Sequence, residues 1–384
     1  MAHLPPSTHI TLLKLSSISA FRQLALSVAL LIIFLTSHVH TSRACQICTP
    51  FPRESSADLL LAAEAVVFAR EDPERPFRFS TIKNLKGDPG EQPIDLFLDS
   101  NTRRILTTRP DRSVVLALIK ADCGATLWRR IGLADDDFGP VVQRILDAAE
   151  SWKADPSSRF DFFTEWLGHS NTQLRTLAHI EIARAPYYRI RECGGKVSRE
   201  EIYRFLGNVR YMEWHPLYIL LLASSEHPED HEKIRQSFRS SAEFGLTTKL
   251  SAWTTAYIEI AEDEAIDAIE ELFFSRADRS PEELMAVQQA LSVHGNNGHV
   301  HLRDRIIASY AVLLKKHPER AVDLLSDLKM WRRTDLSSVM ADIVADPPES
   351  IDVQSLLQLR RHVLTQMRSN LKTGFAPAPT PKLK

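Results

Sequence analysis

Residues 158–182 read SRFDFFTEWLGHSNTQLRTLAHIEI and predict two short amphipathic helices joined by a tight turn. In each half the apolar residues recur at the spacing of one buried helix face. Gly168 begins the break between the halves, and Asn171 is a favourable N-cap for the second helix. Neither helix can bury its apolar face alone, so the pair needs neighbours along the chain.

The chain continues in this way to about residue 370. Apolar residues recur at helical spacing, and Pro216, Pro228 and Pro281 stand where helices begin. Leucines that align with the second helix lie about 33 to 43 residues apart, within the range of helical solenoids: Leu174, Leu217, Leu250, Leu284 and Leu324. The unit at 160–182 resembles a HEAT repeat, and this resemblance implies an all-α solenoid over 157–370. Residues 371–384 predict a disordered Pro/Ala/Lys tail.

Residues 45–153 have a different pattern, which predicts a small β-rich domain. Apolar and β-branched runs bounded by turn residues predict five strands, with a short helix before them and a longer one, 138–152, after them. The strands are expected at 65–70, 77–85, 94–98, 114–119 and 125–129. Five strands with flanking helices favour a small, partly open OB-type barrel. The fold class expected is therefore α+β and multidomain, an OB-like β-barrel followed by a HEAT-like solenoid.

The start of this domain also resembles a known family. Cys45 and Cys48, a short helix, and then VVFAR and PFRFSTIKNLKG are similar to the netrin-like barrel of the tissue inhibitors of metalloproteinases. The resemblance covers residues 45 to about 150 and implies a disulfide-tied barrel. It also implies that the amino-terminal cysteine, here Cys45, would chelate the zinc of a target protease.

The N-terminus predicts export. Lys14 and Arg22 precede an apolar run, 24–35, that is too short to span a membrane and has the length of a signal-peptide core. Ser42-Arg43-Ala44 is a small-x-small cleavage site, so residues 1–44 are expected to be removed. We expect a periplasmic or extracellular protein with no membrane span after cleavage. The alternatives are an uncleaved anchor or lipid attachment at Cys45.

The four cysteines are Cys45, Cys48, Cys123 and Cys193. In an oxidising compartment an even number favours disulfides, and four cysteines allow three pairings. We expect Cys123 to pair with Cys45 or Cys48. The alternatives for the Cys45-x-x-Cys48 motif are a thiol–disulfide redox pair and part of a zinc site.

Composition and motifs exclude several functions. The net charge is −2 and no basic cluster occurs, so nucleic acid is not an expected partner. No nucleophile elbow, zinc-protease helix or nucleotide loop occurs, which favours a role without catalysis or a cofactor.

Two local patterns remain as weak site candidates. His294, His299 and His301 lie within eight residues and could hold a transition metal, or could be solvated histidines of an inter-helix loop. Tyr187 and Tyr188 are a candidate exposed aromatic pair for binding.

Together these patterns predict an exported, non-catalytic protein-binding or scaffold protein, because solenoids offer extended surfaces to protein partners. The alternatives are a protease inhibitor acting through Cys45 and a redox protein using Cys45 and Cys48.

Overall fold

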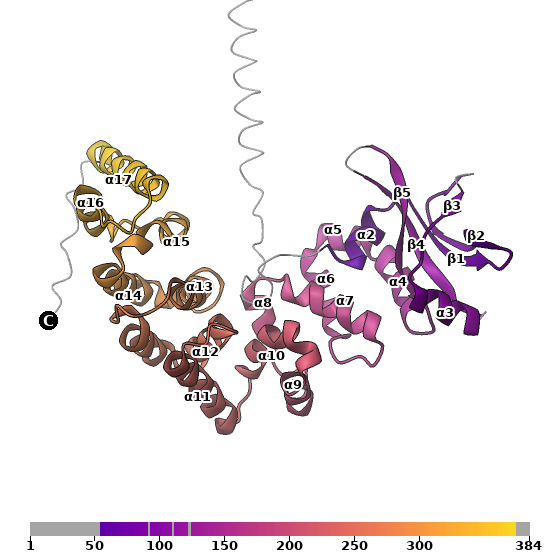
Figure 1. Cartoon of the computed structure of the whole chain (residues 1–384), viewed down its shortest axis with the longest axis horizontal. Coiled ribbons are helices and arrows are strands. Elements are labelled where there is room, and N and C mark those ends of the chain that lie inside the picture. The colour runs from indigo at the N-terminus through magenta and orange to yellow at the C-terminus, as the bar shows by residue number, and fades with distance from the viewer. Residues whose placement is uncertain (1–53, 91–92, 110, 122–123, 374–384) are drawn as a thin grey trace, which may run out of the picture. The chain divides into compact units, whose positions relative to one another are not determined.

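The computed structural model describes residues 54–90, 93–109, 111–121 and 124–373. Over these residues the architecture is α+β, with one curled five-stranded antiparallel sheet followed by a succession of helices (Figure 1). The predicted signal segment, Cys45, Cys48, Cys123 and the tail from residue 374 lie outside the described residues.

The sheet has the strand order β3-β2-β1-β4-β5. Its strands are β1 (Ala65–Asp72), β2 (Arg75–Lys86), β3 (Ile94–Asp95), β4 (Ser113–Lys120) and β5 (Thr126–Ala134). The apolar runs AVVFA and VVLALI form the central strands β1 and β4, in which Val67 faces Leu116. Such continuous runs are typical of strands buried on both faces. The five predicted strands are confirmed, with β3 shorter and β5 longer than expected.

Helices cover both faces of the sheet. On one face Val66, Val115 and Ala117 join the core formed by α2 (Ser56–Ala62) and α4 (Phe138–Asp147). On the other face Val67 and Leu116 pack in a second core with Leu106 of α3 (Ser100–Thr108). The alternation follows from the period of two along a strand. Helix α3 was not predicted.

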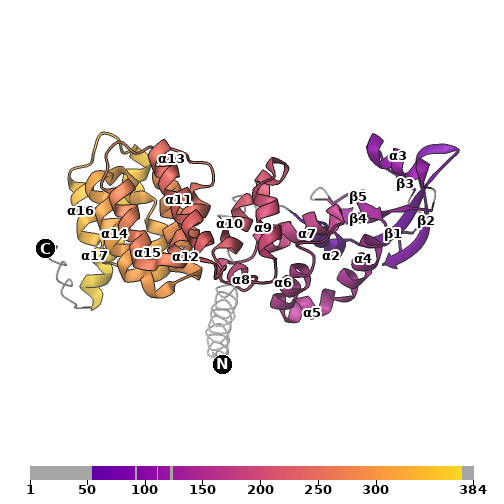
Figure 2. The same ribbon diagram turned by 90° about the horizontal axis from the view of Figure 1, so that it is seen from below.

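The remaining helices follow in sequence. They are α5 (Ala149–Ala154), α6 (Pro156–Thr164), α7 (Thr172–Ala183), α8 (Tyr187–Arg191), α9 (Arg199–Leu206), α10 (His215–Leu222), α11 (Pro228–Phe244), α12 (Leu250–Ile269), α13 (Pro281–Asn297), α14 (Arg303–Lys316), α15 (Leu325–Trp331), α16 (Ser337–Ala345) and α17 (Val353–Thr373). Four short helical turns interrupt them: η1 (Val209–Trp214), η2 (Glu270–Phe274), η3 (Val300–Leu302) and η4 (Pro318–Val322). From α11 to α14 each helix packs on the next (Figure 2).

Local signals set most helix ends. The side chain of Asn171 accepts hydrogen bonds from the amides of Gln173 and Leu174, which confirms it as the N-cap of α7. Pro228 and Pro281 begin α11 and α13, where a missing N–H costs nothing. The single helix predicted over 138–152 is wrong, because α4 ends at Asp147 and α5 begins at Ala149.

One apolar core connects the sheet to the helices. It includes Ala57 of α2, Val142 of α4 and Leu174 of α7, and it extends to Val363 of α17. The domain boundary expected near residues 153–157 stays a prediction. Helix α17 reaches Thr373, so it also covers the first residues of the predicted tail.

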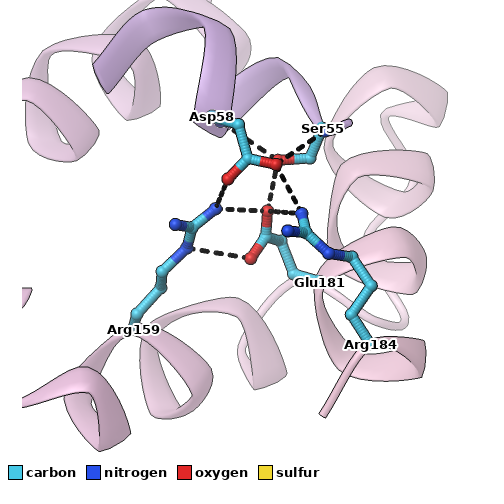
Figure 3. A network of polar contacts seen from close by, with 5 residues as sticks. All are labelled: Ser55, Asp58, Arg159, Glu181 and Arg184. Atoms are coloured by element: carbon cyan, nitrogen blue, oxygen red, sulfur yellow. Dashed lines mark hydrogen bonds and ion pairs between the residues drawn. The ribbon is translucent and has the colours of Figure 1, made fainter. Parts of the chain in front are cut away.

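A polar network ties α2 to α6 and α7 (Figure 3). Arg159 donates to Asp58 at 2.6 Å and to Glu181 at 2.7 Å, and Arg184 donates to Asp58 at 2.5 Å. The hydroxyl of Ser55 donates to Glu181 and accepts from the amide of Asp58. The buried part of this network holds α2, which precedes the sheet, against α6 and α7, the two helices predicted at residues 158–182.

Among the described residues, no helix has both the length and the apolar character needed to cross a membrane.

Candidate metal centre

Three segments bring titratable side chains together beside the end of α13. Helix α12 supplies Glu259 and Glu262, and the last turn of α13 supplies His294. His299 stands directly before η3, and His301 lies within that turn. The chain can turn back over the end of α13 because the helix stops at Asn297 and Gly298 follows. The structure thus brings the three predicted histidines into one cluster and adds two carboxylates to them.

His294 is fully buried, and its hydrogen bonding fixes its tautomer. Its Nε2 lies 2.9 Å from the carbonyl oxygen of Thr255. A carbonyl can only accept, so Nε2 carries the proton and Nδ1 keeps its lone pair. That Nδ1 is buried and has no hydrogen-bond partner. Histidines that bind metals characteristically donate the other ring N–H to a carbonyl or carboxylate in this way.

A glycine leaves room beside the free nitrogen of His294. A methyl group added at Gly298 would lie 2.6 Å from Nδ1, far inside contact distance. The ring of Tyr187 packs edge-on against the His294 ring at 5.2 Å between centroids. The space next to Nδ1 is therefore bounded by glycine backbone on one side and shielded from water by an aromatic ring.

Glu259 is the buried acid of the cluster, with a side chain 13% exposed. Its Oε1 accepts from Arg191 at 2.7 Å, and its Oε2 accepts from the Tyr187 hydroxyl at 2.9 Å. His299 Nε2 lies 3.3 Å from the same Oε2, although it is not aligned as a hydrogen bond. Burial raises the pKa of Glu259, but His299, His294 and Arg191 outweigh burial and lower it.

Glu262 is the exposed acid, and its backbone is unusual. Its φ of 42° and ψ of −111° interrupt the helical geometry of α12, in a region that side-chain-bearing residues rarely adopt. Its carboxylate lies 3.0 Å from His301 Nε2 and 3.6 Å from His299 Nδ1. Strained residues of this kind often occur at functional sites.

The pKa values of the two inner histidines shift in opposite directions. Burial lowers the pKa of His294 to about 4, so this ring is neutral near pH 7. The Glu259 carboxylate raises the pKa of His299, although burial acts against it. The neutral His294 ring has the protonation state that a metal ion requires, whereas at His299 the ion must displace any proton that the ring holds.

Two overlapping sets of three ligands result. Glu259, His294 and His299 form an inner set, and Glu262, His299 and His301 form an outer set. Within each set the donor atoms lie within 4.8 Å of one another. Donor atoms on a tetrahedral ion with bonds of about 2.1 Å are about 3.4 Å apart, so small side-chain rotations close each set. The His294 and His299 rings are almost parallel, at 11°, so His299 must turn to share an ion with His294.

The other candidates from the sequence lie elsewhere or act differently. Tyr187 is buried and bonded to Glu259, so its prediction as an exposed binding residue is wrong, whereas Tyr188 is 48% exposed. Cys193 is a buried free thiol, and burial raises its pKa to about 12. Burial and a raised pKa make a thiol unreactive. The pairing of Cys45, Cys48 and Cys123 stays a prediction.

Sequence reasoning found the histidines but missed both carboxylates and Arg191. One signal for Glu259 was available, because it interrupts the apolar run Tyr257-Ile258-Glu259-Ile260-Ala261 on a helix. A charged residue within such a run needs a buried partner.

No family model matches the chain, and no curated protein or solved structure matches it either.

Proposed function

We propose that this protein binds a divalent transition-metal ion, such as Zn²⁺, at the inner set formed by Glu259, His294 and His299. The observation that carries the proposal is the lone pair of His294 Nδ1. It is buried, unpartnered and held in the metal-binding tautomer by the Thr255 carbonyl.

The donor set supports this assignment. Two imidazoles and one carboxylate bind zinc in several protein sites and leave a fourth position for water or another ligand. Tyr187 and Arg191 donate to Glu259 and hold its carboxylate, which is the role of outer partners in metal sites. When bound, the ion would supply a Lewis-acidic position in a largely buried part of the helical array.

Calorimetric titration of the metal-free protein with Zn²⁺ tests the proposal. We expect binding that His294→Ala and His299→Ala each weaken by more than about 100-fold, because loss of an outer partner alone costs about 10–100-fold. The matched control is His227→Ala, which removes an exposed histidine outside the cluster and should leave the affinity unchanged.

His294 is buried, so circular dichroism must show that each variant is folded. The less buried His299, with a side chain 13% exposed, keeps the test valid if His294→Ala does not fold. Equal zinc affinity in the folded His299→Ala variant and the unchanged protein would contradict the proposal.

The other expectations from the sequence concern the compartment of this site and the fold that holds it. If the protein is exported to the periplasm or the cell exterior, its site would bind metal ions that are present outside the cytosol. The short helix α2 before a curled antiparallel sheet supports a netrin-like or OB-like barrel. The serial packing of α11 on α12 and α13 on α14 supports a HEAT-like solenoid.

Protein binding is the second candidate function, and α17 favours it. Val353, Leu357, Leu364 and Met367 are each more than half exposed and fall on one helix face. Exposed apolar stripes on helices commonly receive an amphipathic partner helix. Replacing Leu357 and Leu364 by Glu should abolish co-purification of such a partner from the native envelope, and an unchanged set of co-purified proteins would reject this role.

A further inference from the structure

The two ligand sets of the cluster share one residue, His299. The two ring nitrogens of His299 face different carboxylates. Nε2 lies 3.3 Å from Oε2 of Glu259, and Nδ1 lies 3.6 Å from Oε1 of Glu262. One imidazole therefore stands between an inner and an outer group of donors.

We infer that the cluster holds two divalent transition-metal ions bridged by the imidazolate of His299. This inference rests on the proposed function, since it adds a second ion to the inner one. The inner ion is bound by Glu259, His294 Nδ1 and His299 Nε2. The outer ion is bound by Glu262, His301 Nε2 and His299 Nδ1.

The chemistry of the bridge balances without another reactant. Each nitrogen of His299 gives one lone pair to one ion, so the ring must lose its remaining N–H proton, which passes to solvent. The two ions bring four positive charges, and the two carboxylates and the imidazolate supply three negative ones. Water or hydroxide fills the open positions of each ion. No electron transfer is involved.

The bridge also sets the separation of the ions. Bonds of about 2.0–2.1 Å to the two nitrogens of one ring place the ions about 6 Å apart. Ions that share an oxygen bridge lie about 3.5–4 Å apart. The structure supports the longer spacing, because the carboxylates of Glu259 and Glu262 face opposite nitrogens of His299 rather than one another.

Burial predicts the order in which the ions bind. His294 is fully buried and Glu259 is 13% exposed, whereas Glu262 is 47% and His301 is 61% exposed. Ligands held in a dry, packed environment lose less freedom on binding than exposed ones. The inner ion should bind first and more tightly, and the outer ion should exchange with solvent more readily.

The same arrangement has a competing interpretation, in which one ion moves between the two sets. Stoichiometry and magnetic coupling separate these two cases. Cu²⁺ is a suitable probe because imidazole ligands suit it and each isolated ion carries one unpaired electron. Two Cu²⁺ ions joined through an imidazolate couple and lose paramagnetic signal.

The test is a titration of the metal-free full chain with Cu²⁺, followed by equilibrium dialysis, metal analysis and electron paramagnetic resonance. Ions bound by the His299→Ala variant measure binding elsewhere and are subtracted. We expect a difference of two ions per chain. The resonance signal should rise with the first ion and fall as the second binds, with release of one proton to the buffer at the second step.

His301→Ala provides the discriminating variant, because His301 is exposed and its loss does not disturb the core. This variant should bind one ion fewer and keep the full signal of the inner ion, whereas the control His227→Ala should behave like the unchanged protein. One ion per chain, or two ions with additive signals, would overturn the bridge and leave the proposed function in place. Equal binding in the unchanged protein and His299→Ala would overturn both.

Discussion

The backbone of Glu262 gives the sharpest prediction about stability. Its φ of 42° and ψ of −111° match the first central position of a type II′ turn, where glycine is preferred. A side chain in such a region costs on the order of 1–3 kcal/mol. Removing the Cβ atom should therefore release part of this strain.

The comparison that isolates the strain is Glu262→Gly against Glu262→Ala. Both variants lose the carboxylate and its pair with His301, so this loss cancels. Within an ordinary helix Gly is about 1 kcal/mol less favourable than Ala. At Glu262 the order should reverse, with Gly more stable than Ala by up to about 2 kcal/mol after this opposing propensity is deducted from the strain.

Asp263 provides the matched control, since it is the next residue of α12, exposed and free of the kink. Asp263→Gly should be about 1 kcal/mol less stable than Asp263→Ala. The measurement is the free energy of unfolding in urea, followed by circular dichroism. If Ala is the more stable replacement at both positions, the strain at Glu262 is refuted. Both Glu262 variants should also lose the outer ion. Glu262 would then be a residue that lowers the stability of the fold but is needed for metal binding.

Three further predictions concern the packed interior. Burial lowers the pKa of His179 to about 3 against 6.5 in the unfolded chain, so the unfolded state alone takes up this proton as the pH falls below 6.5. Stability should decline between pH 6.5 and 3, and His179→Gln should flatten this decline in pH-dependent unfolding, whereas the exposed control His227→Gln should not. Asp230→Asn should cost on the order of 2–3 kcal/mol in urea unfolding, since Asp230 is fully buried and accepts hydrogen bonds from two nitrogens of Arg199. Leu174→Ala should leave a cavity and cost about 2–5 kcal/mol, and an unchanged melting temperature would contradict its place in the core.

Local chemistry explains which parts of the fold could be predicted. The hairpin at 158–182 contains its own periodicity, break and N-cap, and the structure places α6 and α7 there. The central strands are long apolar runs, so the sequence also predicted them as strands. These signals act within a few residues and do not depend on the rest of the chain.

Helix α3 shows where such signals fail. Its sequence SNTRRILTT is mostly polar, and Leu106 is the apolar side chain that it buries against the sheet. The Asp99 side chain caps it, but a short polar segment gives little periodicity. Its formation depends on the sheet beneath it. The break at Ala148 was unreadable for a related reason, because neither Gly nor Pro marks it.

The metal cluster also contains some residues that the sequence shows together and others that it does not. His294, His299 and His301 lie within eight residues, so the sequence shows them together. Glu259 and Glu262 precede them by more than thirty residues, and only the packing of α12 on α13 brings the two groups within reach. Arg191 and Tyr187 come from further back, on α8. The positions of the outer partners are thus a property of tertiary structure that one sequence does not reveal.

Comparison with other buried polar groups separates this cluster from ordinary core polarity. Asp230 is fully buried, but Arg199, Tyr203 and Ser225 all donate to it, so it needs no further partner. Other buried polar atoms lack a partner too, but the indole N–H of Trp128 has no lone pair to give a metal ion, and Gln288 Oε1 belongs to neither ligand set. His294 Nδ1 has that lone pair and lies beside a buried carboxylate. Leaving it unsatisfied costs about 1–3 kcal/mol, and a bound metal ion would recover this free energy.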